Sequence, residues 1–294
     1  MKIFLTIIQV VLLIAVSPLL SGFIKKVKNN IRMRKGPGVF QPYYDLAKLF
    51  QKDEVISKNT SWIFRITPFI VLASSITAAF LIPVFTSNPC LGSMGDVILI
   101  IFVFALGRFF LALAGLDAGS AFGGMGSSRE MFISSLIEPV IVLSIFTVSL
   151  DAGSTSITAL SGMHFVRFSA AIAAIAFFIA MIAETSRIPV DNRETHLELT
   201  MIHEAMVLEY SGRSLAFIEL ASHIKQAIFF SILANVIMPW QGIPMFMAKI
   251  IVICLLISLI EISVAKMRLF RVVDLASFSF VLALISVIIS SMGY

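Results

Sequence analysis

Charged residues are scarce in this chain of 294 residues: lysine, arginine, aspartate and glutamate together make up 13% of it. Soluble globular proteins contain about a quarter of such residues. Apolar runs of about twenty residues recur along the whole sequence, and a helix of that length spans the hydrocarbon core of a bilayer. The short alternating segments of a membrane β-barrel do not recur. The sequence therefore excludes a soluble protein and predicts an all-α polytopic membrane protein.

Cysteine is also scarce, since the chain has only Cys90 and Cys254 and no Cys-x-x-Cys pair. This excludes an iron–sulfur or zinc ligand set of the usual kind. His196 and His203 are a helical seven residues apart, but they lack the Glu-x-x-His or His-Glu-x-x-His spacing of metal sites. We therefore expect no metal and no cofactor of its own, so any redox centre belongs to a partner subunit.

Eight apolar spans are predicted, which together form a single membrane domain over residues 1–294. A cleavable signal peptide is the alternative for the first span, but its length and the lysines that follow it favour a permanent helix. No internal repeat of the transporter kind is visible. The predicted spans are Ile3–Ile24, Trp62–Phe85, Val97–Leu116, Met131–Leu150, Phe165–Ala183, Leu215–Met238, Phe246–Ala265 and Val272–Met292.

Lysine and arginine concentrate in every second loop, and they are densest in residues 25–60. The positive-inside rule then places these loops in the cytoplasm and both termini outside, in the periplasm if the cell is bacterial. The net charge of +5 arises from that one loop, so it gives no reason to expect a nucleic-acid partner. We expect a multi-pass protein of the inner (plasma) membrane, with a basic loop at 25–60 and an acidic loop at 184–213 on the cytoplasmic side.

The basic loop contains the turn Lys35-Gly36-Pro37-Gly38, followed by an amphipathic pattern over Gln41–Gln51. This pattern predicts a short helix at the membrane surface. Two interpretations stay open: the helix rests on anionic lipid, or it forms a docking surface for a peripheral protein.

Ionisable side chains inside apolar spans are costly, so each is a candidate functional residue. Arg108, Glu138 and Glu184 fall within or at the end of predicted spans, and Glu219, His223 and Lys225 fall within the sixth. Glu219 and His223 are four residues apart and share a helix face. Buried carboxylates can exchange protons near neutral pH, which suggests a proton path. The alternative is a static ion-paired network. Lys249 and Glu261 are expected to snorkel to an interface.

The acidic loop carries Glu194 and Glu198 at helical spacing. If residues 193–209 are helical, these carboxylates and Glu209 lie along one stripe, and Asp191 could cap the helix.

Spaced motifs along the chain resemble the complex I membrane component usually called subunit 1. The central motif residues are Glu184-Thr185, Arg187, Pro189, Asp191, Glu194, Glu198-Leu199 and Glu209-Tyr210-Ser211-Gly212. The first-loop residues are Arg34, Gly36-Pro37, Gln41-Pro42, Asp45, Lys48-Leu49 and Lys52-Asp53, and the late ones are Arg268, Arg271 and Asp274. Within that family, several motifs look like the membrane subunits of formate hydrogenlyase and hydrogenase-4. These are Arg108-Phe109-Phe110, Gly115–Ser120, Ser128-Arg129-Glu130 and Glu138-Pro139.

The resemblance implies a subunit that carries no cofactor, anchors a peripheral redox arm and joins it to antiporter-like proton-pumping subunits. The partners would be peripheral hydrogenase-like large and small subunits, which hold iron–sulfur clusters and, in a hydrogenase, a nickel–iron centre. The implied proton path comprises Glu130, Glu138, Glu184, Asp191, Glu194, Glu198 and Glu209, with Arg108, Arg129 and Arg187 as charge partners. The implied docking residues are Arg34, Lys35, Gly36, Pro37, Gln41, Asp45 and Lys48. A quinone-chamber subunit of a respiratory NADH-quinone oxidoreductase and a stand-alone ion transporter are the alternatives.

Overall fold

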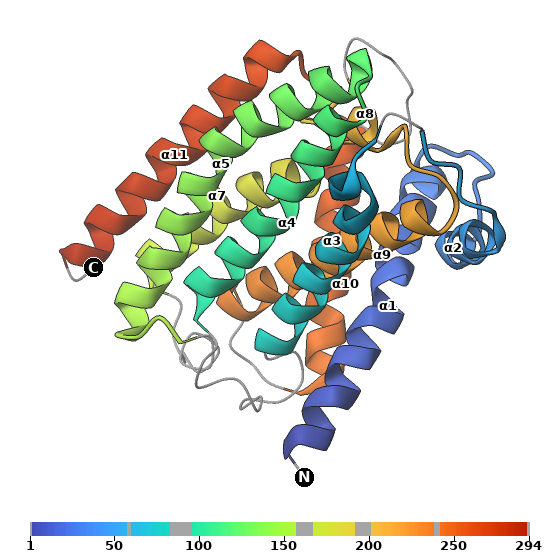
Figure 1. The fold of residues 1–294 in the computed structure, drawn as a ribbon. Helices are drawn as coiled ribbons and strands as arrows, with labels where there is room; N and C mark the ends of the chain where they lie inside the picture. Colours follow the sequence, from blue (N-terminus) through green and yellow to red (C-terminus); the bar gives the residue numbers. More distant parts are fainter. Residues whose placement is uncertain are drawn as a thin grey trace.

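The computed structural model describes residues 2–57, 60–82, 96–156, 167–191, 201–237 and 242–292 (Figure 1). Within these ranges the chain consists of helices and connecting segments, apart from one isolated bridge between Asp96 and Ser156. This confirms the all-α prediction. The helices are α1 (Lys2–Ile31), α2 (Gln41–Gln51), α3 (Trp62–Leu81), α4 (Val97–Asp117), α5 (Ala121–Ala152), α7 (Phe168–Glu184), α8 (His203–Val207), α9 (Gly212–Ile237), α10 (Ile243–Ser263) and α11 (Leu269–Ser291).

Seven of the described helices are long and apolar enough to cross a membrane, namely α1, α3, α4, α5, α9, α10 and α11. The α7 helix is apolar but has only 17 residues, the lower limit of the length that spans a bilayer. The chain is thus a multi-pass membrane protein, and the count of eight spans stays a prediction.

Two helices, α1 and α5, extend beyond the predicted limits by more than one helical turn. The α1 helix continues to Ile31, so the lysines that follow the first apolar run are helical rather than in a loop. The α5 helix begins ten residues earlier than predicted, at Ala121, because the hydroxyl of Ser120 accepts a hydrogen bond from the Gly123 amide at 3.1 Å. A serine at this position satisfies an amide that the first helical turn leaves without a partner.

The α2 helix occupies the predicted residues, Gln41–Gln51. It packs against α1 and α9, and Figure 1 shows it nearly end-on beside the upper end of α1. It therefore crosses the direction of the long helices, as expected of a helix at the membrane surface. The N-terminus lies at the lower end of α1 in Figure 1, far from α2, and the C-terminus lies at the lower end of α11.

Small residues bring the helices close together around the centre of the molecule. A Cβ atom on Gly123 of α5 would meet the Gly115 carbonyl oxygen of α4, so only glycine permits this approach. Close backbone packing is how helices associate in lipid, where apolar surface alone gives no driving force. The α4, α5, α7 and α9 helices thereby present their polar side chains to one another.

Candidate functional site

Arg108 of α4 lies at the centre of a cluster of charged side chains. Its Nη1 atom is 2.5 Å from Oε1 of Glu138 on α5, and its Nη2 donates to the Glu184 carboxylate at the end of α7. Glu130, two turns earlier on α5, lies 4.0 Å from Arg108 Nε, too far for a hydrogen bond. The structure thus brings together three of the predicted path carboxylates and one predicted charge partner.

Lys225 of α9 closes the cluster from the opposite side. Its Nζ atom is 2.6 Å from Oε1 of Glu184, the same oxygen that Arg108 contacts. The Lys225 ammonium also lies 5.8 Å from the centroid of the Phe104 ring, a favourable position for a cation. A buried charge is tolerated only when it is paired, and here two cations share one buried carboxylate.

A second cluster surrounds Glu261 on α10. Its carboxylate is 2.7 Å from Arg187 Nη1 and 3.3 Å from Lys28 Nζ of α1. The Glu261 side chain is only 7% exposed, so the prediction that it snorkels to an interface is wrong. The physical reason is that two cations from distant segments neutralise it inside the protein.

Gln226 on α9 ties this second cluster to α1. Its Oε1 accepts hydrogen bonds from Arg187 Nη2 at 2.8 Å and from the Ser21 hydroxyl at 3.0 Å. The Ser21 hydroxyl also lies 2.9 Å from Nδ1 of His223. Because Arg187 can only donate, the amide orientation of Gln226 is settled. Its Nε2 is buried and has no partner among the described residues.

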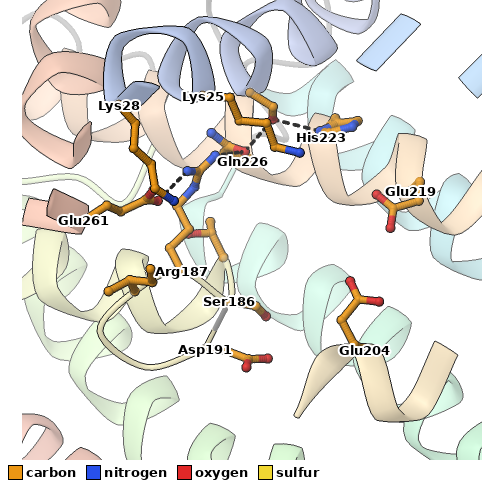
Figure 2. Close-up of a pocket in the computed structure, with 13 residues that line it drawn as sticks. Lys25, Lys28, Ser186, Arg187, Asp191, Glu204, Glu219, His223, Gln226 and Glu261 are labelled. Carbon is orange, nitrogen blue, oxygen red and sulfur yellow. Dashed lines mark hydrogen bonds and ion pairs between the residues drawn. The ribbon is translucent and has the colours of Figure 1, made fainter. Parts of the chain in front are cut away.

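Two polar cavities lie beside these clusters. The first offers about 170 Å³ of space to water-sized molecules, and Figure 2 shows the side chains that surround it. Glu219 and His223 both line it, as their spacing predicts. The second is smaller, about 50 Å³, and is lined by Arg108, Glu130, Glu184 and Lys225 together with small and apolar residues. Water in these spaces would reach both clusters.

Asp191 lines the first cavity and connects two further segments. Its Oδ1 is 2.8 Å from Lys266 Nζ, and its Oδ2 accepts a hydrogen bond from the backbone amide of His203 at 3.1 Å. His203 is the first residue of α8. Asp191 therefore caps a helix from a distance along the chain rather than from the position directly before it.

A continuous helix over 193–209 is not formed, because Met201 and Ile202 are not helical, α8 covers only His203–Val207 and a turn follows it. The turn places the Tyr210 ring on Phe64, with centroids 3.9 Å apart, and its hydroxyl donates to the Phe64 carbonyl at 2.9 Å. Burial raises the pKa of the Tyr210 phenol, which keeps it a donor. The predicted site residues Glu194 and Glu198 lie outside the described residues.

The other predicted site residues are spread over the surface. Glu209 is exposed, and Arg129 donates to the Met201 carbonyl at 3.0 Å. In the first loop, the Gln41 amide donates to Asp45 at 2.9 Å. The remaining docking candidates are exposed or half-buried: Arg34, Lys35, Gly36, Pro37 and Lys48. Apolar side chains are exposed beside them, namely Met33, Phe40, Tyr44 and Val55.

A profile of the NADH dehydrogenase family matches residues 3–291. This chain belongs to that family. It is 33% identical to Formate hydrogenlyase subunit 4 of Escherichia coli strain K12, over 92% of each chain. It is also 33% identical to Hydrogenase-4 component C of the same strain, over 91% of this chain and 84% of the relative. A more distant member is the H-type subunit of the NADH-quinone oxidoreductase of Wolinella succinogenes, 27% identical over 70% of each chain.

The fold of the family is also seen in a solved structure. A chain of the membrane-bound sulfane sulfur reductase, an archaeal respiratory membrane complex, superimposes with a TM-score of 0.87 at 20% identity. The match covers 99% of this chain and 100% of that one. The chain is therefore a multi-pass helical protein of a complex I-like oxidoreductase family, a finding consistent with the inner membrane.

Several residues of the site escaped the sequence interpretation. Lys28 looked like part of a stop-transfer cluster, and Ser21, Ser186 and Gln226 are ordinary polar residues in apolar surroundings. No local pattern could pair Arg187 with Gln226 or with Glu261, because 39 and 74 residues separate them.

Proposed function

We propose that this chain is the membrane-anchor and coupling subunit of a complex I-like membrane-bound hydrogenase, of the formate hydrogenlyase and hydrogenase-4 type. Its identity of 33% with one protein named for each complex, over most of its length, supports this assignment. In this proposal the chain spans the membrane eight times with both termini outside. It docks a peripheral redox arm on the cytoplasmic side and relays charge or protons to antiporter-like subunits in the membrane.

The observation that carries the proposal is the gradient of exposure along the Arg108 cluster. The Glu184 side chain is 4% exposed and that of Arg108 is 6%, whereas that of Glu138 is 36%. The cluster therefore begins deep between four helices and reaches the outer surface of the described chain on α5. A neighbouring membrane subunit that packed on this face of α5 would meet the Glu138 carboxylate directly.

Charge interactions within the cluster couple the protonation of Glu184 to the partly exposed Glu138. When Glu184 takes up a proton, Lys225 and Arg108 both lose a counter-charge at once. Arg108 then interacts more strongly with Glu138 and, after a small movement, with Glu130, whose carboxylate is 4.0 Å away. Pair energies of this kind are strong in a low dielectric, so one protonation event changes the charge balance at the lateral surface.

The first loop would hold the peripheral arm. It offers basic and apolar side chains together, with α2 braced against the bundle by the edge-on contact of Phe50 and Phe217, 5.5 Å between centroids. Interfaces combine apolar anchors with a polar rim, which favours a protein partner over lipid alone. The iron–sulfur clusters and the nickel–iron centre would belong to the hydrogenase-like large and small subunits of that arm.

The test of the proposal is the Glu184→Gln variant in the intact complex. We expect the variant to assemble but to lose coupled proton movement, measured with a pH-sensitive dye in inverted membrane vesicles supplied with formate. The matched control is Asp96→Asn, which makes the same chemical change at the start of α4, where asparagine also caps a helix well. Proton movement at the wild-type rate in Glu184→Gln would refute the coupling role.

The two alternatives predict different results in the same preparation. A quinone-chamber subunit, as the similarity to the NADH-quinone oxidoreductase relative suggests, requires quinone-dependent turnover that chamber-directed inhibitors block. A stand-alone ion transporter requires transport by the purified chain in liposomes without other subunits. The subunits that co-purify with the tagged chain distinguish all three.

A further inference from the structure

Ser186 lies between the two cavities and borders both. It is the one residue in the described ranges that lines both of them. On one side lie Glu184 and Lys225 of the Arg108 cluster, and on the other lie Arg187 and Asp191. Figure 2 shows Ser186 between Arg187 and Glu204 at the edge of the first cavity. A polar group at this position is in reach of water from either side.

The backbone holds Ser186 in an unusual conformation. Its φ angle of +51° falls in the left-handed region, which side chains other than glycine and asparagine rarely adopt. Hydrogen bonds around it close the end of α7: the Ser186 amide donates to Ala183 at 3.0 Å, and the Arg187 amide donates to Ile182 at 3.1 Å. The turn thereby fixes the direction in which the Ser186 side chain points.

The Ser186 hydroxyl has no hydrogen-bond partner within the described part of the chain, although the residue is 7% exposed. Buried hydroxyl groups are normally hydrogen-bonded, so water in the cavities is its natural partner. Ser222, which also lines the second cavity, differs in this respect, because its hydroxyl donates to the Glu219 carbonyl at 2.8 Å. A free hydroxyl at the junction can both accept and donate a proton.

We propose that the Ser186 hydroxyl relays protons between the two cavities and so connects the first cavity to Glu184, which lines the second. This inference rests on the proposed coupling function. In each transfer Oγ accepts a proton from a hydronium ion in the first cavity, which leaves as water, while its own O–H proton passes to a water or to the Glu184 carboxylate in the second. The hydroxyl stays neutral, one proton enters and one leaves, and rotation about the Cβ–Oγ bond restores the starting state.

The test compares four variants of the intact complex in inverted vesicles supplied with formate, with a pH-sensitive dye as the probe. Ser186→Ala removes the hydroxyl with little change in size. We expect proton movement to slow by about 100-fold, the lower end for a positioned proton-transfer group, and to become more sensitive to replacement of water by D2O. Ser186→Gly lacks the hydroxyl but leaves room for a water molecule and suits the left-handed backbone, so it should recover part of the rate.

The remaining variants separate this inference from the proposed function. Ser222→Ala is the control, because its hydroxyl is already held by the helix, and it should behave as the wild type. If Glu184→Gln is impaired but Ser186→Ala is not, the relay role is wrong and the coupling function stands. If neither variant is impaired, the coupling function itself is wrong. A slow Ser186→Ala variant with an unchanged D2O effect would assign the residue a purely structural role and overturn the relay.

Discussion

The Arg108→Gln variant tests whether the central cluster is held together by charge. In the wild type the guanidinium contacts two carboxylates from two helices, Glu138 at 2.5 Å and Glu184. Removing one partner of a buried ion pair costs about 3–5 kcal/mol, since it leaves an uncompensated charge. Lys225 still pairs with Glu184 at 2.6 Å, and the Glu138 side chain is 36% exposed and so less buried than its partner. These two facts place the expected cost at the lower end, about 3 kcal/mol.

Thermal unfolding of the detergent-solubilised complex measures this cost. At about 2 °C per kcal/mol for a chain of this size, we expect the melting temperature to fall by about 6 °C. The double variant Arg108→Gln, Glu138→Gln removes one charge of each sign and keeps the pair of Glu184 and Lys225. It should therefore be more stable than the single variant. A single variant that melts with the wild type, or a double variant that melts below the single one, would refute the electrostatic account of the cluster.

Three further changes probe other parts of the molecule. Replacing both Arg34 and Lys35 by alanine should lower the yield of the co-purifying peripheral arm, because it removes two exposed cations from the first loop; a complete arm at normal yield would contradict the docking role. Glu261→Gln removes the carboxylate that the buried Lys28 and the partly buried Arg187 share, so we expect a loss of about 3 kcal/mol in stability, to be checked as a lower melting temperature. Gly212→Ala should destabilise the chain by about 2 kcal/mol. The reason is that φ at Gly212 is +54° and a Cβ there would lie 2.6 Å from the Asp53 carbonyl oxygen. An unchanged melting temperature would show that the contact between Gly212 and Asp53 can relax.

The helices were the predictable part of the fold. Gln41–Gln51 was located to the residue, because its amphipathic pattern and the turn before it are both local signals. The predicted start of α5 is too late, because the prediction follows the apolar run alone, and this run begins only at Met131. The capping residue Ser120 marks the true start of the helix. In a membrane protein, hydropathy marks the part of a helix that lies in lipid, and capping residues mark where the helix itself begins.

The buried ionisable residues were predictable as a class but not as pairs. Arg108, Glu138 and Glu184 stood out because charge inside an apolar span is costly, whereas Lys28 was hidden among the lysines that follow the first span. The prediction for Glu261 is wrong because its position near the end of a span hides its burial. A carboxylate near the end of a span looks like a snorkelling residue until the segments that neutralise it are known.

What the sequence by itself determined is the all-helical membrane class, the residues of α2 and the identity of the costly charges, because each depends on residues within a few turns of one another. What only the tertiary structure decided is which charges meet. Arg108 finds Glu184 across 76 residues, and Ser21 finds Gln226 across 205. Such contacts arise when helices pack closely and bury polar groups together, so they are properties of the packed bundle. The position of Ser186 between the two cavities is the same kind of fact, since the lining of a cavity exists only after the helices have come together.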